Sequence, residues 1–186
     1  MLMEKVWGNR MAFVVIDMQR KYWVDRPDWD EVLERTVSVI NHIADDFRAH
    51  GLPVIFVRFP GKTCRGDDPP DGDEFHHGLN VLDSDIIMDK PTMNAFNKTD
   101  LEGIVRGNEC DTVLISGCVS QYCVISTYYS AFDHDIVSYI AEGSTIGTTE
   151  EMEKGLETLA KTLSVERIHR RLEELSAKER GDITGR

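Results

Sequence analysis

The sequence predicts an α/β protein built around a mostly parallel β-sheet. Short apolar runs of strand length alternate with longer segments whose apolar residues recur every three or four positions. This alternation is typical of parallel strands that are connected by helices. The chain has 186 residues, of which 41% are hydrophobic, enough for one domain with a sizeable core but too little for two. We therefore expect residues 1–186 to form a single domain.

The first half of the chain begins with a strand, a helix and a second strand. The run MAFVVIDMQ is fully apolar up to Asp17, as in a buried parallel strand. The next segment has one apolar helical face, which ends before Gly51. The residues of that face are Leu33, Val37, Ile40, Ala44 and Phe47. The run PVIFVRF then predicts the second strand.

A long segment follows the second strand and shows neither the helical nor the strand periodicity of apolar residues. Residues 60–80, PGKTCRGDDPPDGDEFHHGLN, are rich in Gly, Pro and Asp, which interrupt helices and strands. A loop of about twenty residues inside a compact domain is often a lid or a binding loop. We therefore predict a lid loop at 60–80.

The second half of the chain repeats the alternation. Strands are predicted at DIIM, DTVLIS and DIVSYIAEG, and helices at TDLEGIVRG, SQYCVISTYYSAF, TTEEMEKGLETLAKTL and VERIHRRLEEL. The polar tail after about residue 176, SAKERGDITGR, is expected to be frayed.

The charge and the apolar runs exclude several classes of partner. The formal net charge is −12, and a field of this sign repels nucleic acid and anionic membranes. The longest apolar runs fall far short of the ~20 residues that a membrane-spanning helix needs. No signal peptide is evident. We expect a cytoplasmic protein with reduced cysteines that binds a small molecule and neither nucleic acid nor membrane.

Three chemically distinctive groups directly follow predicted strands. Asp17 ends the first strand, Lys90 follows the third, and the motif GCVSQYC follows the fourth. In open parallel sheets, functional sites gather at the carboxyl ends of the strands. We therefore expect these groups to meet at one edge of the sheet, although the sequence separates them widely.

The motif GCVSQYC, residues 117–123, allows several interpretations of its two cysteines. Cys123 lies in the first turn of a predicted helix, where the helix dipole and a nearby Lys90 ammonium would lower the pKa of its thiol. Asp17 could then take the thiol proton from a nucleophilic Cys123. Both cysteines could equally be small core residues. A redox pair or a zinc site fits less well, because the spacing differs from Cys-x-x-Cys and from zinc-finger patterns.

Three segments, in order along the chain, resemble the isochorismatase-like cysteine hydrolases. They are VVIDMQ, DKPTMNAFNKTDL and DTVLISGCVSQYCVISTYYSAF, and the resemblance extends over residues 11–163. It implies a three-layer α/β/α, Rossmann-like sheet with helices on both faces. It also implies a catalytic triad formed by Asp17, Lys90 and Cys123.

The resemblance implies a reaction as well. Cys123 would attack the carbonyl carbon of a small amide, ureide or carbamoyl compound, an amine or ammonia would leave, and water would hydrolyse the resulting acyl-enzyme. The alternative is a catalytically silent family member that serves as a binding or scaffold protein. The presence of all three triad residues argues against that alternative.

The resemblance also implies a particular backbone geometry just before the nucleophile. The N–H groups of Val119 and Cys123 would form an oxyanion hole, and the peptide bond between Cys118 and Val119 would be cis. Ser120 raises a conflict if it acts as an N-cap on the Cys123 N–H, which the oxyanion hole needs; it could cap the Tyr122 N–H instead.

Cofactors and assembly follow from the same resemblance. Nicotinamidases of this superfamily carry an Asp-x-His metal motif after the second strand, where this chain reads VRFPGK. Arg58, Phe59 and Pro60 cannot supply those carboxylate and imidazole ligands. We therefore expect no metal and no other cofactor. Family members are usually dimers or tetramers, so we expect a homo-oligomer.

Five further residues are candidates for lining the substrate pocket. They are Gln19, Trp23, Asn94, Phe96 and Tyr122. Each has an ordinary alternative role, at the surface, in a subunit contact or in the core. Asn94 stands where related sequences carry Ser, so this part of the pocket is expected to differ.

Overall fold

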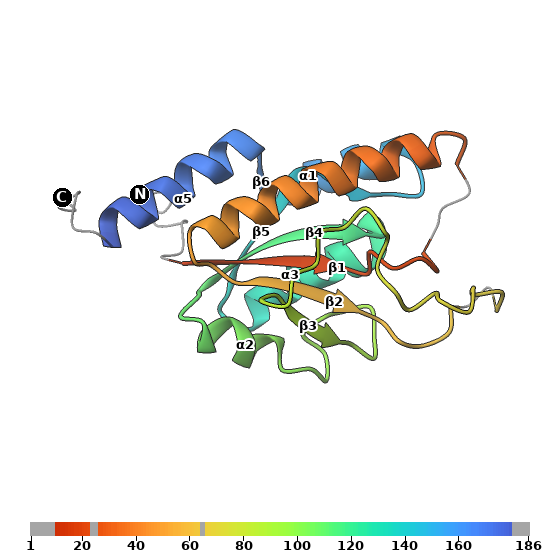
Figure 1. Cartoon of the computed structure of the whole chain (residues 1–186), viewed down its shortest axis with the longest axis horizontal. Coiled ribbons are helices and arrows are strands. Elements are labelled where there is room, and N and C mark those ends of the chain that lie inside the picture. The colour runs from red at the N-terminus through yellow and green to blue at the C-terminus, as the bar shows by residue number, and fades with distance from the viewer. Residues whose placement is uncertain (1–9, 23–25, 64–65, 180–186) are drawn as a thin grey trace.

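A six-stranded, wholly parallel sheet forms the centre of the molecule, which we describe from a computed structural model (Figure 1). The structure describes residues 10–22, 26–63 and 66–179. The strands lie in the order β3-β2-β1-β4-β5-β6. They are β1 (Met11–Ile16), β2 (Val54–Arg58), β3 (Ile86–Asp89), β4 (Thr112–Cys118), β5 (Val137–Ile146) and β6 (Thr162–Leu163).

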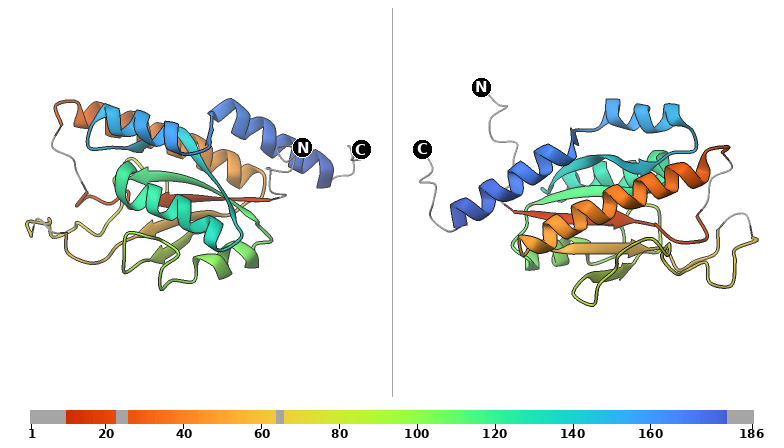
Figure 2. Two further views of the ribbon diagram at one scale, coloured as in Figure 1. Left: turned by 180° about the vertical axis from the view of Figure 1, so that it is seen from behind. Right: turned by 45° about the horizontal axis from the view of Figure 1, so that its top comes forward.

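Helices cover both faces of the sheet, which gives the three layers that the sequence predicts (Figure 2). They are α1 (Trp29–Ala49), α2 (Leu101–Gly107), α3 (Ile125–Asp133), α4 (Glu150–Leu159) and α5 (Val165–Glu179). The apolar faces of α1 and α5 pack on one side of the sheet. The apolar faces of α2 and α3 pack on the other side, together with Leu156 of α4. The α/β fold class is therefore confirmed.

The two central strands of the sheet, β1 and β4, are buried on both faces, as their continuous apolar sequence requires. Every residue of β1 and β4 is buried. Successive residues of β1 point to opposite cores: Phe13 and Val15 contribute to the α1 side, and Val14 and Ile16 to the α3 side. Their carboxyl ends are therefore fixed within a packed interior, which is where the candidate site lies.

Two elements differ from the expected pattern. The helix predicted over residues 148–163 ends at Leu159, and Thr162 and Leu163 form β6 by pairing with Ile140 and Ala141 of β5. The helix predicted from Ser120 begins instead with a π-helical turn, η1 (Ser120–Val124), before α3. The first difference arises from long-range pairing at the edge of the sheet, which helical periodicity does not report.

The long loop and the tail agree with the sequence in part. Between Phe59 and Asp85, the described residues form no helix and no strand beyond an isolated bridge of Phe75 with Gln19. A lid function for this loop stays a prediction. At the other end, α5 continues to Glu179, past the expected start of the frayed tail, and residues 180–186 lie outside the described part. None of the described helices is long and apolar enough to span a bilayer.

Candidate active site

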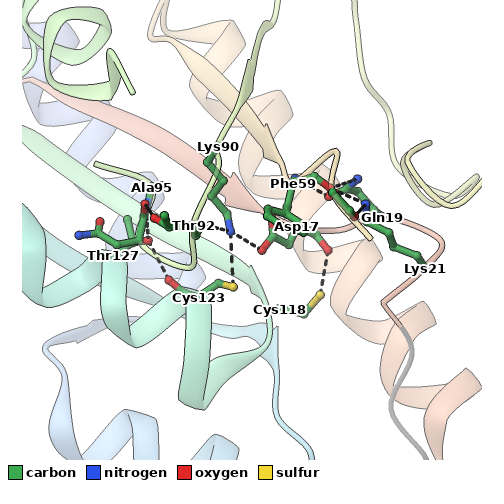
Figure 3. Close-up of polar contacts among 12 residues, drawn as sticks. Asp17, Gln19, Lys21, Phe59, Lys90, Thr92, Ala95, Cys118, Cys123 and Thr127 are labelled. Carbon is green, nitrogen blue, oxygen red and sulfur yellow. Dashed lines mark hydrogen bonds and ion pairs between the residues drawn. The ribbon is translucent and has the colours of Figure 1, made fainter. Parts of the chain in front are cut away.

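Asp17, Lys90 and Cys123 meet at the carboxyl edge of the sheet (Figure 3). Lys90 Nζ lies 2.8 Å from Asp17 Oδ2 and donates a hydrogen bond of 3.5 Å to Cys123 Sγ. The same ammonium donates to the carbonyl oxygen of Thr92 at 2.9 Å. Asp17 is fully buried, and Lys90 and Cys123 are 1% and 8% exposed. The strand ends therefore bring the three groups together, as the sequence predicts.

Each of these side chains is positioned by backbone contacts at a strand end. Asp17 follows β1 with a φ of 50°, in the left-handed region that Asp tolerates better than most residues. Its N–H donates to the carbonyl oxygen of Val57 at 2.8 Å, and the Lys90 N–H donates to that of Arg58 at 2.9 Å. The ends of β1 and β3 are thus both fastened to β2, which lies between them.

The nucleophile candidate is held by a link between α3 and the segment after Lys90. Thr127 Oγ1 donates to the carbonyl oxygen of Cys123 at 2.8 Å and accepts a hydrogen bond from the N–H of Ala95 at 3.0 Å. Thr127 and Ala95 are buried. This link fixes η1 relative to the segment that supplies Lys90, although the two are far apart in sequence.

Gly117 allows β4 to approach β1 closely just before the site. Its φ is 109°, and a Cβ atom at this position would lie 2.0 Å from the carbonyl oxygen of Ile16. Ile16 and Gly117 are register partners, and Asp17 and Cys118 follow them directly. Only glycine meets both the backbone angle and the space available.

Burial controls the electrostatics of the site. Desolvation raises the pKa of Asp17, while the Lys90 ammonium and a hydrogen bond with the Cys123 thiol act in the opposite direction. Desolvation also raises the pKa of Cys123 to about 12, and the negative charge of Asp17 adds to this effect. The sequence-based prediction of a lowered Cys123 pKa is therefore wrong, because burial outweighs the attraction of Lys90. The resting sulfur is a thiol, so its attack on a substrate needs a base.

The raised pKa predicts how Cys123 reacts with iodoacetamide. Below a pKa of about 12, the thiolate fraction grows about tenfold with each pH unit. We expect the alkylation rate of Cys123 to rise by about that factor per unit from pH 7 to pH 10, without levelling off. Peptide mass spectrometry localises the label to Cys123 and separates it from Cys110. A rate that reaches a plateau near neutral pH would show that the thiolate is already favoured.

Cys118 is a core residue rather than a partner of Cys123. Its thiol is 2% exposed and donates to the carbonyl oxygen of Asp17 at 2.9 Å. Full burial raises the pKa of Cys118 well above its ordinary value. The two sulfur-bearing residues pack into different cores, Cys118 on the α1 side and Cys123 on the α3 side. Cys110, Cys118 and Cys123 are all free thiols, so the geometry disfavours the redox interpretation.

The backbone ahead of Cys123 has the predicted geometry at one bond. The peptide bond between Cys118 and Val119 is cis, as expected. The N–H groups of Tyr122 and Val124 donate to the carbonyl oxygen of Val119, at 2.9 and 3.4 Å. Ser120 Oγ is buried and caps neither Cys123 nor Tyr122. The conflict between capping and the oxyanion hole is thereby removed.

A cavity of about 290 Å³ lies beside Cys123 and Lys90. It is lined by Tyr22, Phe59, Lys62, Thr63, Lys90, Thr92, Met93, Val119, Tyr122 and Cys123. Tyr122, one of the predicted pocket residues, is 52% exposed. Trp23, another of them, lies outside the described residues. Aromatic and aliphatic side chains thus share the wall with two lysines, two threonines and Cys123, a mixture of apolar surface and a few polar groups as in many small-molecule sites.

Three other predicted pocket residues have different contacts and are not among those lining the cavity. Gln19 is fully buried and binds the Phe59 backbone, accepting from its N–H at 2.7 Å and donating to its carbonyl oxygen at 3.2 Å. Asn94 Nδ2 donates to Ser130 Oγ at 2.9 Å. Phe96 belongs to the core on the α3 side. They support neighbouring segments, and a role for them in binding substrate stays a prediction.

Sequence reasoning missed several residues that the structure places at the site. Phe59, Lys62 and Thr63 come from the start of the long loop, and Thr92 and Met93 follow Lys90. Loop residues of this kind have no periodic pattern that would mark them. Among the described residues, no group of three His, Cys, Asp or Glu side chains is arranged to hold a metal ion. Independence from metal stays a prediction.

The chain is similar in sequence and in fold to known proteins. Residues 11–166 match the model of the Isochorismatase domain. YddQ of Bacillus subtilis (strain 168), an uncharacterized isochorismatase family protein, is 26% identical over 149 residues, which cover 76% of this chain and 81% of YddQ. The structure of N-carbamoylsarcosine amidase from Thermoplasma acidophilum is similar, with 25% identity, a TM-score of 0.70, and coverage of 83% of this chain and 96% of that one. An isochorismatase-like hydrolase from Alkaliphilus metalliredigens has the same fold, with 21% identity, a TM-score of 0.74, and coverage of 87% and 98%.

Proposed function

Because this chain belongs to the isochorismatase family, we propose that it is a cysteine-dependent hydrolase that cleaves a C–N bond in a small amide, ureide or carbamoyl compound. The observation that carries the proposal is the double contact of Lys90, with the Asp17 carboxylate and with the Cys123 sulfur, at the wall of a cavity. The similarity to an amidase at 25% identity supports the same type of reaction.

In the first half of the proposed reaction, Asp17 acts as the base. Its carboxylate takes the proton of the Cys123 thiol, and the sulfur forms a bond to the substrate carbonyl carbon. The N–H groups of Val119 and Cys123 stabilise the negative oxygen of the tetrahedral intermediate. Asp17 then returns the proton to the leaving nitrogen as the C–N bond breaks. Because burial raises the pKa of Asp17, its protonated form is a less costly state than it would be in water.

In the second half, water releases the acyl group. Asp17 takes a proton from the water as its oxygen attacks the thioester carbon, and the C–S bond breaks. The sulfur then recovers its proton and the acid product leaves. Throughout, the Lys90 ammonium compensates the negative charge on Asp17 or Cys123, because it contacts both.

A direct test is a screen for ammonia release over small amides, ureides and carbamoyl compounds, with Cys123→Ala as the blank. We expect at least one compound to be hydrolysed by the parent protein and not by the blank. If no compound turns over and the alkylated protein still binds ligands normally, the catalytically silent binding protein is the better assignment.

We also propose a homo-oligomer located in the cytoplasm. Tyr129 and Phe132 of α3 and Leu159 of α4 are 50%, 41% and 65% exposed, and such apolar residues are often covered by a subunit contact. Light scattering gives the test, since a mass equal to one chain of 21.1 kDa at micromolar concentration would contradict the oligomer. Fractionation of cells tests the location.

A further inference from the structure

Lys21 carries a buried ammonium group that the proposed chemistry does not use. Its side chain is only 1% exposed. Its Nζ donates to the carbonyl oxygens of Phe59 and Gly61, the latter at 2.7 Å, and forms an ion pair with Asp73. All three acceptors belong to the long loop after β2. A buried ammonium is tolerated only with such complete pairing, so Lys21 and these loop segments are held together.

Neighbouring residues fasten the same two parts of the loop. We call residues 59–63 and 66–73 the loop flanks. Gln19 Nε2 donates to the carbonyl oxygens of Phe59 and Asp73, at 3.2 and 3.1 Å. The Lys21 N–H donates to the carbonyl oxygen of Gly72 at 3.2 Å. The beginning and the middle of the loop are thus joined at one place, beside the residues that directly follow β1 and Asp17.

The first loop flank forms part of the wall of the cavity. Phe59, Lys62 and Thr63 line it next to Cys123. Two cations lie near the Phe59 ring, with Lys21 Nζ at 5.3 Å and Lys90 Nζ at 5.6 Å from its centroid. At these distances an ammonium is attracted to an aromatic face. Figure 3 shows Lys21, Gln19 and Phe59 gathered beside Asp17.

We propose that Lys21 is a positioning residue of the active site, whose ammonium holds the loop flanks together and so fixes Phe59, Lys62 and Thr63 as the substrate-binding wall. This inference rests on the proposed function. The ion pair and the hydrogen bond of Lys90 join Asp17 and Cys123 directly, and the loop flanks meet this group through the Phe59 ring, 5.6 Å from Lys90 Nζ. Lys21 therefore controls substrate binding, and the chemical step depends on it little.

Lys21→Met tests this role, because it removes the ammonium and keeps an unbranched apolar stem. We expect KM for the best substrate of the screen to rise about tenfold or more, while kcat stays within about threefold of the parent value. Hydrogen exchange of peptides from the loop flanks should become faster, and exchange in β1, β4 and α3 should not change. The rate of Cys123 alkylation at pH 9 should match that of the parent.

Arg20→Met is the matched control. The Arg20 guanidinium reaches Asp71 and His77 of the same region from the adjacent position, and Arg20 is not among the residues that line the cavity. We expect KM, kcat and loop exchange to stay near the parent values. Equal effects in the two variants would mean that any contact to the loop suffices, and the specific role of Lys21 would be lost.

Other outcomes overturn the proposal in distinguishable ways. A parallel fall in kcat and in Cys123 alkylation would show that Lys21 acts on the triad through its charge, since it is one of the groups that lower the Asp17 pKa. Faster exchange throughout the chain would show a general role in stability. If the parent protein hydrolyses none of the compounds, the proposed function fails. Separately, unchanged hydrogen exchange of the loop flanks in Lys21→Met would show that Lys21 does not hold them together.

Discussion

Cys123→Ala is expected to abolish hydrolysis while the fold stays intact. The substitution removes the sulfur that accepts a hydrogen bond from Lys90, at a residue that lines the cavity. Loss of a covalent nucleophile costs about a thousandfold or more in kcat, because water must then attack without an acyl-enzyme. Loss of one buried sulfur costs little stability compared with this. Ammonia release and thermal unfolding of the same preparation give the two measurements.

Cys118→Ala is the matched control for this substitution. The change is chemically identical and lies five residues away, but the Cys118 thiol donates to a carbonyl oxygen inside the other core. We expect activity within about tenfold of the parent, because the thiol contacts the backbone carbonyl of Asp17 and neither the Asp17 carboxylate nor the Cys123 sulfur is its partner. An inactive Cys118→Ala beside an active Cys123→Ala would exchange the roles of the two cysteines and refute the proposed mechanism.

Asp17→Asn and Lys90→Met should each reduce kcat by about a hundredfold or more, because the members of a triad act as a unit. Each should also lower the free energy of unfolding by about 3 kcal/mol, since it leaves the other member of a buried ion pair without its counter-charge. Rates from the ammonia assay and unfolding in urea at pH 7 measure the two effects.

The two single variants should respond differently to pH. In Lys90→Met, Asp17 loses the main group that lowers its pKa, so the pKa, already raised by burial, rises further. The folded state then binds a proton more tightly than the unfolded state. Its stability should therefore be greatest below the ordinary Asp pKa of 3.8 and decrease as the pH rises toward the raised value. Asp17→Asn has no such carboxyl group and should lack this dependence.

The double variant Asp17→Asn/Lys90→Met separates stability from catalysis. It removes both buried charges, so we expect it to be more stable than either single variant. Its activity should stay as low as theirs, because neither a base nor its cation is present. A double variant no more stable than the single ones would show that the ion pair is not the source of their instability.

Much of the fold and the centre of the site can be predicted from the sequence. The run from Met11 to Ile16 is apolar without interruption because β1 is buried on both faces, and such a strand is recognisable without any relative. The strand ends place Asp17, Lys90 and the cysteine motif at one edge by topology alone. The choice of Cys123 over Cys118 as the nucleophile depends on the resemblance to a family. The two cysteines lie five residues apart in one motif, and either could be a buried core residue.

Other features depend on contacts between residues that are far apart in sequence, and no local sequence pattern reports such contacts. The pKa of Cys123 rises because the surrounding core excludes water, and the extent of that exclusion is set by the packed tertiary structure. Gln19 and Lys21 appear in sequence as ordinary polar loop residues, yet their buried side chains bind the backbone of a segment about 40 residues away. The edge pairing that forms β6 likewise replaces the end of a predicted helix.

Gly117 has no side-chain functional group, yet it determines how far apart the reactive atoms lie. A methyl group there would collide with the carbonyl oxygen of Ile16, and the collision could be relieved only by moving the end of β4 away from the end of β1. Since Asp17 follows one strand end and η1, with Cys123, follows the other, the base and the sulfur would separate. Position 117 therefore sets the distance between the two strand ends and has no room for a side chain. In a mutational scan it should be as intolerant of substitution as the catalytic residues themselves.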